Sequence, residues 1–269
     1  MAVTHPIHLQ IVPKGKWLPP SLAHRIRAYH PQTELGKVVK ACLGTLSAEQ
    51  AGDLLDAITR SVVIETALSA TVIRHPDSPL AGGWRPMDPD GMERLYTLHA
   101  LRHEALTEGD FVLADRLMPR IARLSHQAGL VEEHGVVSRR VVTDAGVQFL
   151  VDAWQNLVEM EIMKYHALGT GTTAEAASQT ALVTELSTAY NPDNTRATGS
   201  LTEGASANIF RSVGTNTLDG SAAVTEHGLL SQAATGGGVL WDRSVFSVLN
   251  LAASDSLQTT YDLSAASGG

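Results

Sequence analysis

The chain has 269 residues, of which 43% are hydrophobic and 18% are charged, so it can bury a sizeable core without metals or disulfides. The single cysteine, Cys42, excludes an internal disulfide and a four-cysteine zinc site, and with them the small secreted scaffolds and the zinc fingers. No apolar run reaches the roughly 20 residues that a transmembrane helix needs, and the first residues lack the pattern of a secretory signal. We therefore expect a soluble protein with no membrane partner.

The two halves of the chain differ in charge. Residues 1–140 hold 16 Lys and Arg against 15 Asp and Glu, whereas residues 141–269 hold 4 against 13. The acidic half repels phosphate, and the chain has no basic stripe of the kind that drives nucleic-acid binding. We therefore do not expect nucleic acid as a partner.

Residues 1–32 contain five prolines, too many for a continuous helix, and are predicted to form an extended arm with a short helix at 22–29. Because Ile7, Leu9 and Ile11 alternate along the chain, the arm can add as a strand to the sheet edge of a neighbouring protein. Trp17 suits the alternative, in which the arm folds back on the helices of its own subunit. The sequence leaves both alternatives open.

Helical spacing follows the arm. A capping box at 47–50 precedes apolar residues that keep a helical period, and it predicts a helix that runs to Ile73. A Pro- and Gly-rich loop is predicted at 75–89, and Asp90 is predicted to cap the next helix.

The dipeptide Gly109-Asp110 ends that helix, and a further helix is predicted at 111–127, with Gly129 as its C-terminal cap. The segment 108–114 resembles the joint of a tetratricopeptide-type helix pair, but a solenoid needs about three such units. We interpret it as a single helical hairpin and predict a helical domain over 33–135.

From Val136 onward the pattern changes. Val141 and Val142 are strand-like, a helix is predicted at 145–157, and from Met160 the apolar period falls to two. The predicted strands cover 195–201, 207–218, 222–230, 239–251 with a break near Asp242 and Arg243, and 256–263. Turn signals but no crossover helices separate them, so the sheets should be antiparallel.

The predicted fold class is therefore α+β, with a helical N-terminal half followed by an antiparallel β-sandwich of jelly-roll type. The predicted domains are an extended proline-rich arm at 1–32, a helical domain at 33–135 and a β-sandwich domain at 136–269.

Three patterns are candidates for chemistry. Residues 169–174 match G-x-G-x-x-A, yet no second parallel strand follows, so we interpret them as a turn and predict no cofactor. His99 and His103 are spaced i, i+4 beside Glu104, which suits a metal, but a third ligand is lacking and we favour two solvated or packed histidines. Glu226 and His227 are adjacent on a strand and should point to opposite faces.

No G-x-S-x-G elbow frames any serine. We therefore predict no catalytic, cofactor-binding or metal-binding residues and no enzyme activity. Arg243 is predicted to be a structural residue that pairs with Asp242 or another carboxylate.

Eight short distinctive runs lie between about residue 137 and the end of the chain. They are Val141-Val142-Thr143-Asp144-Ala145-Gly146, Met163-Lys164-Tyr165-His166, Gly169-Thr170-Gly171-Thr172-Thr173-Ala174-Glu175-Ala176, Thr180-Ala181-Leu182, Ala207-Asn208-Ile209-Phe210-Arg211-Ser212-Val213, Val224-Thr225-Glu226-His227-Gly228-Leu229, Asp242-Arg243-Ser244-Val245-Phe246 and Ser267-Gly268-Gly269. Taken together, residues 137–269 resemble a widespread, poorly characterised family of tailed-bacteriophage virion structural proteins. In that family the sequence before the shared part is short, so the helical segment 33–130 is a departure.

The resemblance implies a non-enzymatic structural component of a tailed-phage virion, made in the host cytoplasm. We expect a capsid decoration or cement protein that binds the major capsid protein. A tail, neck or baseplate protein is the alternative, and a metal-dependent enzyme is a third. By analogy with jelly-roll virion proteins we expect a homo-oligomer, specifically a trimer.

Overall fold

A computed structural model describes residues 63–82, 87–139 and 142–266 of the chain. Within this part, residues 64–264 form one compact unit. The predicted arm at 1–32 and the capping box at 47–50 lie outside the described residues.

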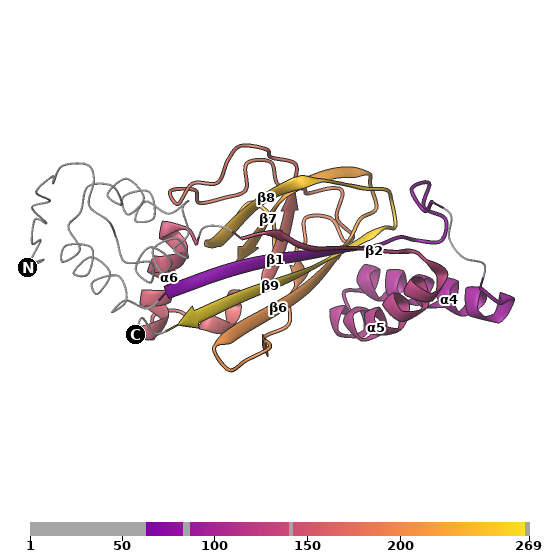
Figure 1. The fold of residues 1–269 in the computed structure, drawn as a ribbon, viewed down its shortest axis with the longest axis horizontal. Coiled ribbons are helices and arrows are strands. Elements are labelled where there is room, and N and C mark those ends of the chain that lie inside the picture. Colours follow the sequence, from indigo (N-terminus) through magenta and orange to yellow (C-terminus); the bar gives the residue numbers. More distant parts are fainter. Residues whose placement is uncertain (1–62, 83–86, 140–141, 267–269) are drawn as a thin grey trace, which may run out of the picture. The chain divides into compact units, whose positions relative to one another are not determined.

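The described residues form a mixed α+β fold with two antiparallel sheets (Figure 1). One sheet has the strand order β2-β1-β9-β6-β5, and the other has the order β4-β3-β7-β8. Strands supply most of the C-terminal part. In chain order the elements are β1 (Val63–Ile73), α4 (Pro89–Glu108), α5 (Phe111–Ala128), β2 (Val131–Ser138), α6 (Asp144–Trp154), the short 3-10 helix η1 (Met160–Ile162), β3 (Tyr165–Gly169), β4 (Ala197–Thr198), β5 (Thr202–Glu203), β6 (Ile209–Thr217), β7 (Ala222–Leu230), β8 (Leu240–Leu251) and β9 (Ser256–Ala266).

The first difference from the sequence prediction is strand β1, because residues 63–73 were predicted as the end of a helix. Thr66, Leu68, Ala70 and Val72 are buried while the residues between them are not, which is the period of a half-buried strand. β1 also pairs antiparallel with β2, from Leu68 opposite Ser138 to Ile73 opposite Val131. The prediction of an all-helical N-terminal half is therefore wrong for these residues, and the predicted boundary at 135/136 falls inside β2.

The predicted helical hairpin is confirmed. Asp88 caps α4 by accepting a hydrogen bond from the Gly91 amide, two residues before the predicted cap Asp90. Gly109 ends α4 in the left-handed conformation, and Asp110 caps α5 through the Leu113 amide. The hairpin has its own small core, which contains Ile73, Leu95, Leu117, Met118, Ile121, Ala128 and Leu130.

Most of the predicted C-terminal elements are present, with changes at their ends. β7 has the predicted bounds, and β8 is continuous through Asp242 and Arg243 but shifts register against β7 between Leu229 and Leu230. The stretch predicted as a strand at 195–201 contains only the two-residue β4. The strand orders establish two antiparallel sheets, and the jelly-roll topology is a more specific assignment than these orders establish.

The main core combines side chains from both sheets with one face of α6. Leu68, Trp241, Leu257 and Tyr261 belong to it, and the Trp241 indole donates to the Tyr261 hydroxyl over 2.9 Å. Gly146 places α6 against β8, since a Cβ at this position would lie 2.5 Å from the Trp241 carbonyl oxygen. Only glycine permits this approach.

Candidate functional site

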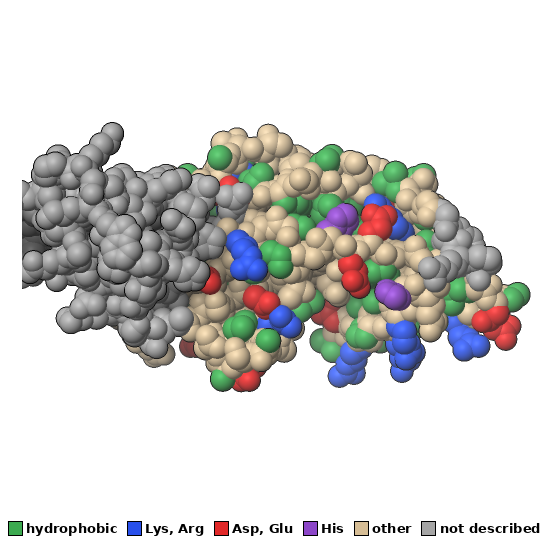
Figure 2. All heavy atoms as spheres, in the orientation of Figure 1, with side chains coloured by type: hydrophobic (Ala, Val, Ile, Leu, Met, Phe, Trp, Pro, Cys, Tyr) green, Lys and Arg blue, Asp and Glu red, His purple; other side chains and the backbone are tan. Residues whose placement is uncertain are grey.

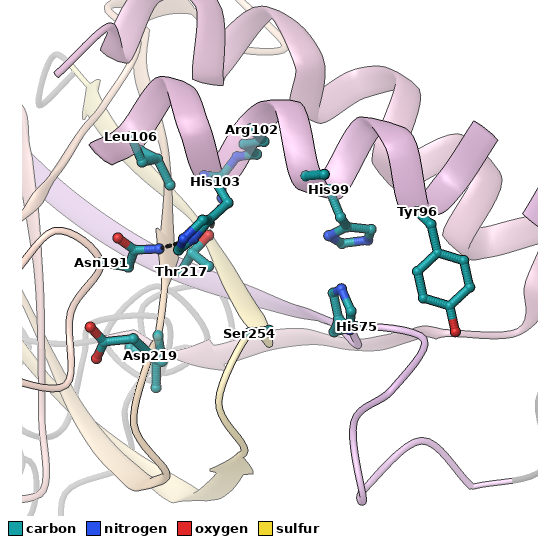
Figure 3. Close-up of a pocket in the computed structure, with 12 residues that line it drawn as sticks. His75, Tyr96, His99, Arg102, His103, Leu106, Asn191, Thr217, Asp219 and Ser254 are labelled. Atoms are coloured by element: carbon teal, nitrogen blue, oxygen red, sulfur yellow. Dashed lines mark hydrogen bonds between the residues drawn. The ribbon is translucent and has the colours of Figure 1, made fainter. Parts of the chain in front are cut away.

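A cavity of about 460 Å³ lies beside α4, and Figure 3 shows the residues that line it. His99, Arg102, His103 and Leu106 come from one helical face, at positions i, i+3, i+4 and i+7. The opposite wall comes from His75 after β1 and from chain segments that surround the end of β6. The cavity therefore joins the helical hairpin to the strands.

The histidines of this cavity turn in different directions. His99 points toward His75, and their ring centroids are 4.7 Å apart in an edge-on arrangement, whereas His103 turns to the Asn191 amide at 3.0 Å (Figure 3). Burial lowers the pKa of His99 to about 3 and also lowers that of His75. Both imidazoles beside the hairpin are therefore neutral at pH 7.

The predicted pair His99 and His103 is thus not brought together on one ligand. Within residues 63–82, 87–139 and 142–266, no group of three or more His, Cys, Asp or Glu side chains is placed to hold a metal ion. Arg102, which the sequence analysis did not single out, lies between His99 and His103 on α4 and is only 4% exposed. Its spacing of seven residues after Leu95 and four before Leu106, inside the buried stripe, was the available signal.

A second polar group is sealed between the two sheets. His166 on β3 and His227 on β7 are fully buried, with 3.0 Å between His166 Nδ1 and His227 Nε2. The His166 ring also bonds the hydroxyls of Ser212 on β6 and Thr259 on β9, each over 2.9 Å. His166 therefore links one sheet to the other. Burial lowers the pKa of His166 to about 3 and that of His227 well below its usual value.

Glu226, the neighbour of His227, faces the other side of β7, as the strand period predicts. Its carboxylate pairs with Arg243 over 2.7 Å and accepts hydrogen bonds from three backbone amides. These belong to Gly171, Val183 and Thr184. Arg243 is 1% exposed and also donates to the Thr173 carbonyl. The predicted pairing of Arg243 with a carboxylate is confirmed, with Glu226 rather than Asp242 as its partner.

The same contacts explain the glycine-rich segment at 169–174. The Gly171 amide donates to Glu226 over 3.0 Å, and the segment after it lies on β7 and β8 rather than opening a helix. No helix among the described residues follows β3, so the turn interpretation holds there. The network fastens residues 170–185 to the sheet.

Asp242 lies on β8 and is fully buried. It accepts hydrogen bonds from Thr66 on β1 over 3.0 Å and from Ser244 over 3.1 Å. Burial raises the pKa of Asp242 to about 7. Together with His166, this residue forms a polar connection across the sandwich.

An exposed apolar surface covers the outer face of α6 and the turn after it. We call it the α6 surface; its residues are Val147, Val151, Trp154, Leu157 and Met160. The first three are spaced i, i+4 and i+7, and Trp154 is 76% exposed. An apolar cavity of about 220 Å³ begins at Met160 and extends between Met163, Phe210, Leu229, Trp241 and Leu263. The α6 surface is thus continuous with a pocket that one apolar side chain could fill.

Charge is distributed unevenly around these features. Asp144, Asp152, Glu159 and Glu161 flank the α6 surface, and Lys164 is the single Lys or Arg between residues 141 and 195. On the face shown in Figure 2, by contrast, Lys and Arg side chains gather over the α4–α5 hairpin. The exposed Arg116, Arg120 and Arg123 of α5 belong to that hairpin.

No model of a known protein family matches the chain, and no curated protein or solved structure does so either. In the described part of the chain, no helix is both long and apolar enough to cross a membrane.

Proposed function

We propose that this protein is a non-enzymatic structural component of a tailed-phage virion, a capsid decoration or cement protein that attaches through the α6 surface. The resemblance of residues 137–269 to a family of virion proteins supports this function. The jelly-roll type of sandwich, a trimeric state and localisation in the virion are parts of the same proposal.

The exposed α6 surface carries the proposal. Helices of a single folded chain turn their apolar stripe inward, and a contiguous exposed apolar patch on a soluble protein marks an interaction site. Here Phe149 faces the core while Val147, Val151 and Trp154 face outward, so α6 is apolar on two sides. A large aromatic residue at the centre of such a patch is the typical anchor of a protein interface.

The acidic residues around the α6 surface specify the partner's chemistry. Asp144, Glu159 and Glu161 are exposed, and two copies of this surface would place like charges opposite each other. The complementary surface therefore belongs to a different protein, with an apolar centre and a basic rim. We assign this surface to the major capsid protein.

The buried polar groups support a structural rather than a catalytic role. Glu226, Arg243, His166 and Asp242 are closed off from solvent and hydrogen-bonded within the fold. Their bonds connect strands, sheets and the 170–185 segment, which stiffens the sandwich. A rigid body with one adhesive face suits attachment to a lattice.

The test of the proposed function is the copy number of the chain in purified particles of the phage that encodes it, measured by quantitative mass spectrometry against the major capsid protein. A decoration protein is expected at hundreds of copies, following the lattice symmetry, whereas about six to twelve would indicate the neck or baseplate. Absence from the particles would contradict a virion role.

The attachment surface is tested with the variant Trp154→Ser and the matched control Val248→Ser, which changes an exposed apolar residue of β8. Trp154→Ser is expected to weaken binding to particles that lack the protein by about tenfold or more, because a buried aromatic anchor is lost. The control should bind as the unchanged protein does. Equal binding by both variants would place the attachment surface elsewhere.

A further inference from the structure

The cavity beside α4 contains a buried cation, Arg102, that makes no ion pair with any carboxylate of the described residues. The arginines with ion pairs in the described part of the chain include Arg74, Arg196, Arg211 and Arg243, and Arg102 is not among them. The one carboxylate that acts on it electrostatically, Asp115, makes no ion pair with it. Burying a charge without a partner is costly, so this position calls for an explanation.

Two nitrogen atoms at the cavity have no hydrogen-bond partner among the residues that the structure describes. They are Arg102 Nε and His99 Nε2, both buried, although the Arg102 guanidinium donates to the Thr217 hydroxyl and to the Thr215 carbonyl. The spacing i, i+3 on α4 puts the two side chains on one face. A buried guanidinium N–H in a folded protein almost always has an acceptor, and Arg102 Nε has none among the described residues. The Nε2 atom of neutral His99 is a donor or an acceptor according to its tautomer.

The carboxylates near the cavity have other partners or lie at its rim. Asp77 accepts a hydrogen bond from the Tyr96 hydroxyl. Asp255 accepts hydrogen bonds from Arg74 and Ser78. Asp219 is exposed and lies across the cavity from His99 in Figure 3. None of the three fills the position between Arg102 and His99.

We propose that this cavity binds a small oxyanion, a phosphate or carboxylate group, between Arg102 and His99. Arg102 Nε donates one charge-assisted hydrogen bond, and neutral His99, as the Nε2-protonated tautomer, donates a second. His103 and Asn191 lie at the open side, where they can contact the rest of the ligand. With about 460 Å³, the cavity has room for more than the anionic group alone.

The experiment uses the full chain and two probes, inorganic phosphate and malonate, at pH 7 and constant ionic strength, followed by calorimetric titration and by the melting temperature. We expect saturable binding of at least one probe and a melting temperature that rises with its concentration. Phosphate alone would identify a phosphoryl ligand, and malonate alone a carboxylate ligand. Chloride at the same ionic strength should have no such effect.

The variants Arg102→Gln and His99→Phe are each expected to weaken binding about tenfold or more, since each removes a hydrogen bond to the anion. The control Arg116→Gln removes an exposed positive charge of α5 and should leave binding unchanged. His99→Phe keeps the test decisive if Arg102→Gln does not fold. If neither probe binds the folded protein, or if the control weakens binding as much as the cavity variants do, the proposal is wrong.

Discussion

Arg243 and Glu226 are both buried, so neither can lose its partner without leaving a charge inside the protein. We predict that Arg243→Met lowers the free energy of unfolding by about 3–5 kcal/mol, because the Glu226 carboxylate is then buried and unpaired. Adding Glu226→Gln should recover part of this loss, since the amide carries no charge. Urea denaturation followed by circular dichroism measures both effects.

The control for this prediction is Arg211→Met. Arg211 pairs with Asp262 over 2.7 Å, but its side chain is 37% exposed, and solvent-exposed pairs are worth about 1 kcal/mol or less. A loss in Arg243→Met no larger than in Arg211→Met would show that the buried pair is not a principal support of the sandwich.

The buried histidines predict how stability depends on pH. In the folded state the pKa of His166 falls to about 3 and that of His227 falls well below 6.5, so the unfolded chain binds more protons below about pH 6.5. Their contribution is complete above that pH and is lost as the pH falls below it, by about 1.4 kcal/mol per pH unit for each ring until the folded pKa of that ring is reached. His227→Gln should make the acid side of the stability profile shallower by that amount.

Asp242 acts in the opposite direction. Because its folded pKa is raised to about 7, the folded state holds the proton more tightly, and stability from this residue is present at low pH and lost as the pH rises through 7. Asp242→Asn should therefore make the acid side steeper. Thermal unfolding between pH 4 and 8 measures both slopes, and parallel profiles for His227→Gln and the unchanged protein would contradict the prediction.

Among the helices and strands, local sequence signals predicted some elements correctly. They failed where the secondary structure depends on pairing with strands that are distant in the sequence. The caps Gly109, Asp110 and Gly129 are local signals, and so are the turn signals on either side of β7, Asp219-Gly220 and the glycines at 236–238. The hairpin and that strand therefore followed from the sequence. β1 has β-branched residues at both ends, but the capping box before it favoured a helix, and only pairing with β2 and β9 makes it a strand.

The candidate sites show the same limit. His99 and His103 were visible as a pair, but their divergence depends on His75 and on Asn191, which is 88 residues from His103 in the chain. The Glu226–Arg243 pair depends on the register of β7 against β8. No local pattern encodes either contact, whereas the choice of Arg243 as a structural residue needed only its rarity as a cation in an acidic half.

The α4–α5 hairpin is an insertion between two strands that pair with each other. Arg74 and Leu130 meet at its base, where the Arg74 amide donates to the Leu130 carbonyl over 2.8 Å. We predict that replacing residues 75–129 by Asn-Gly, with Ile73→Thr and Leu130→Thr to cover the exposed base, leaves a sandwich that still unfolds cooperatively. The hairpin packs around its own apolar cluster, so the main core keeps its side chains.

Circular dichroism and thermal unfolding check this prediction, with loss of helical signal and a retained β transition as the expected result. A product without a cooperative transition would show that the hairpin is needed to bring β1 and β2 together.

For the whole molecule, the position of β1 and β2 in the sheet determines which fragment can fold. A fragment of residues 136–269, the β domain predicted from the sequence, lacks β1 and most of β2, so β9 loses its neighbour on one side. It also loses Leu68 and Val72 from the core, each worth about 1.5–3 kcal/mol of burial. Together they contribute about 3–6 kcal/mol, which reaches the lower end of the whole stability of a typical domain, about 5–15 kcal/mol.

We therefore predict that residues 63–269 unfold in one cooperative transition, whereas residues 136–269 bind a dye specific for exposed apolar surface and show no such transition. The two fragments share every residue of the acidic half, so a difference between them comes from the segment that carries β1, the hairpin and the start of β2. The hairpin-deleted chain described above separates these contributions, since it restores β1 and β2 without α4 and α5. In the described sheet, β1 is the strand that lies between β2 and β9. A 136–269 fragment that melts like the longer one would contradict the prediction, because it would show that the sheet is stable without β1.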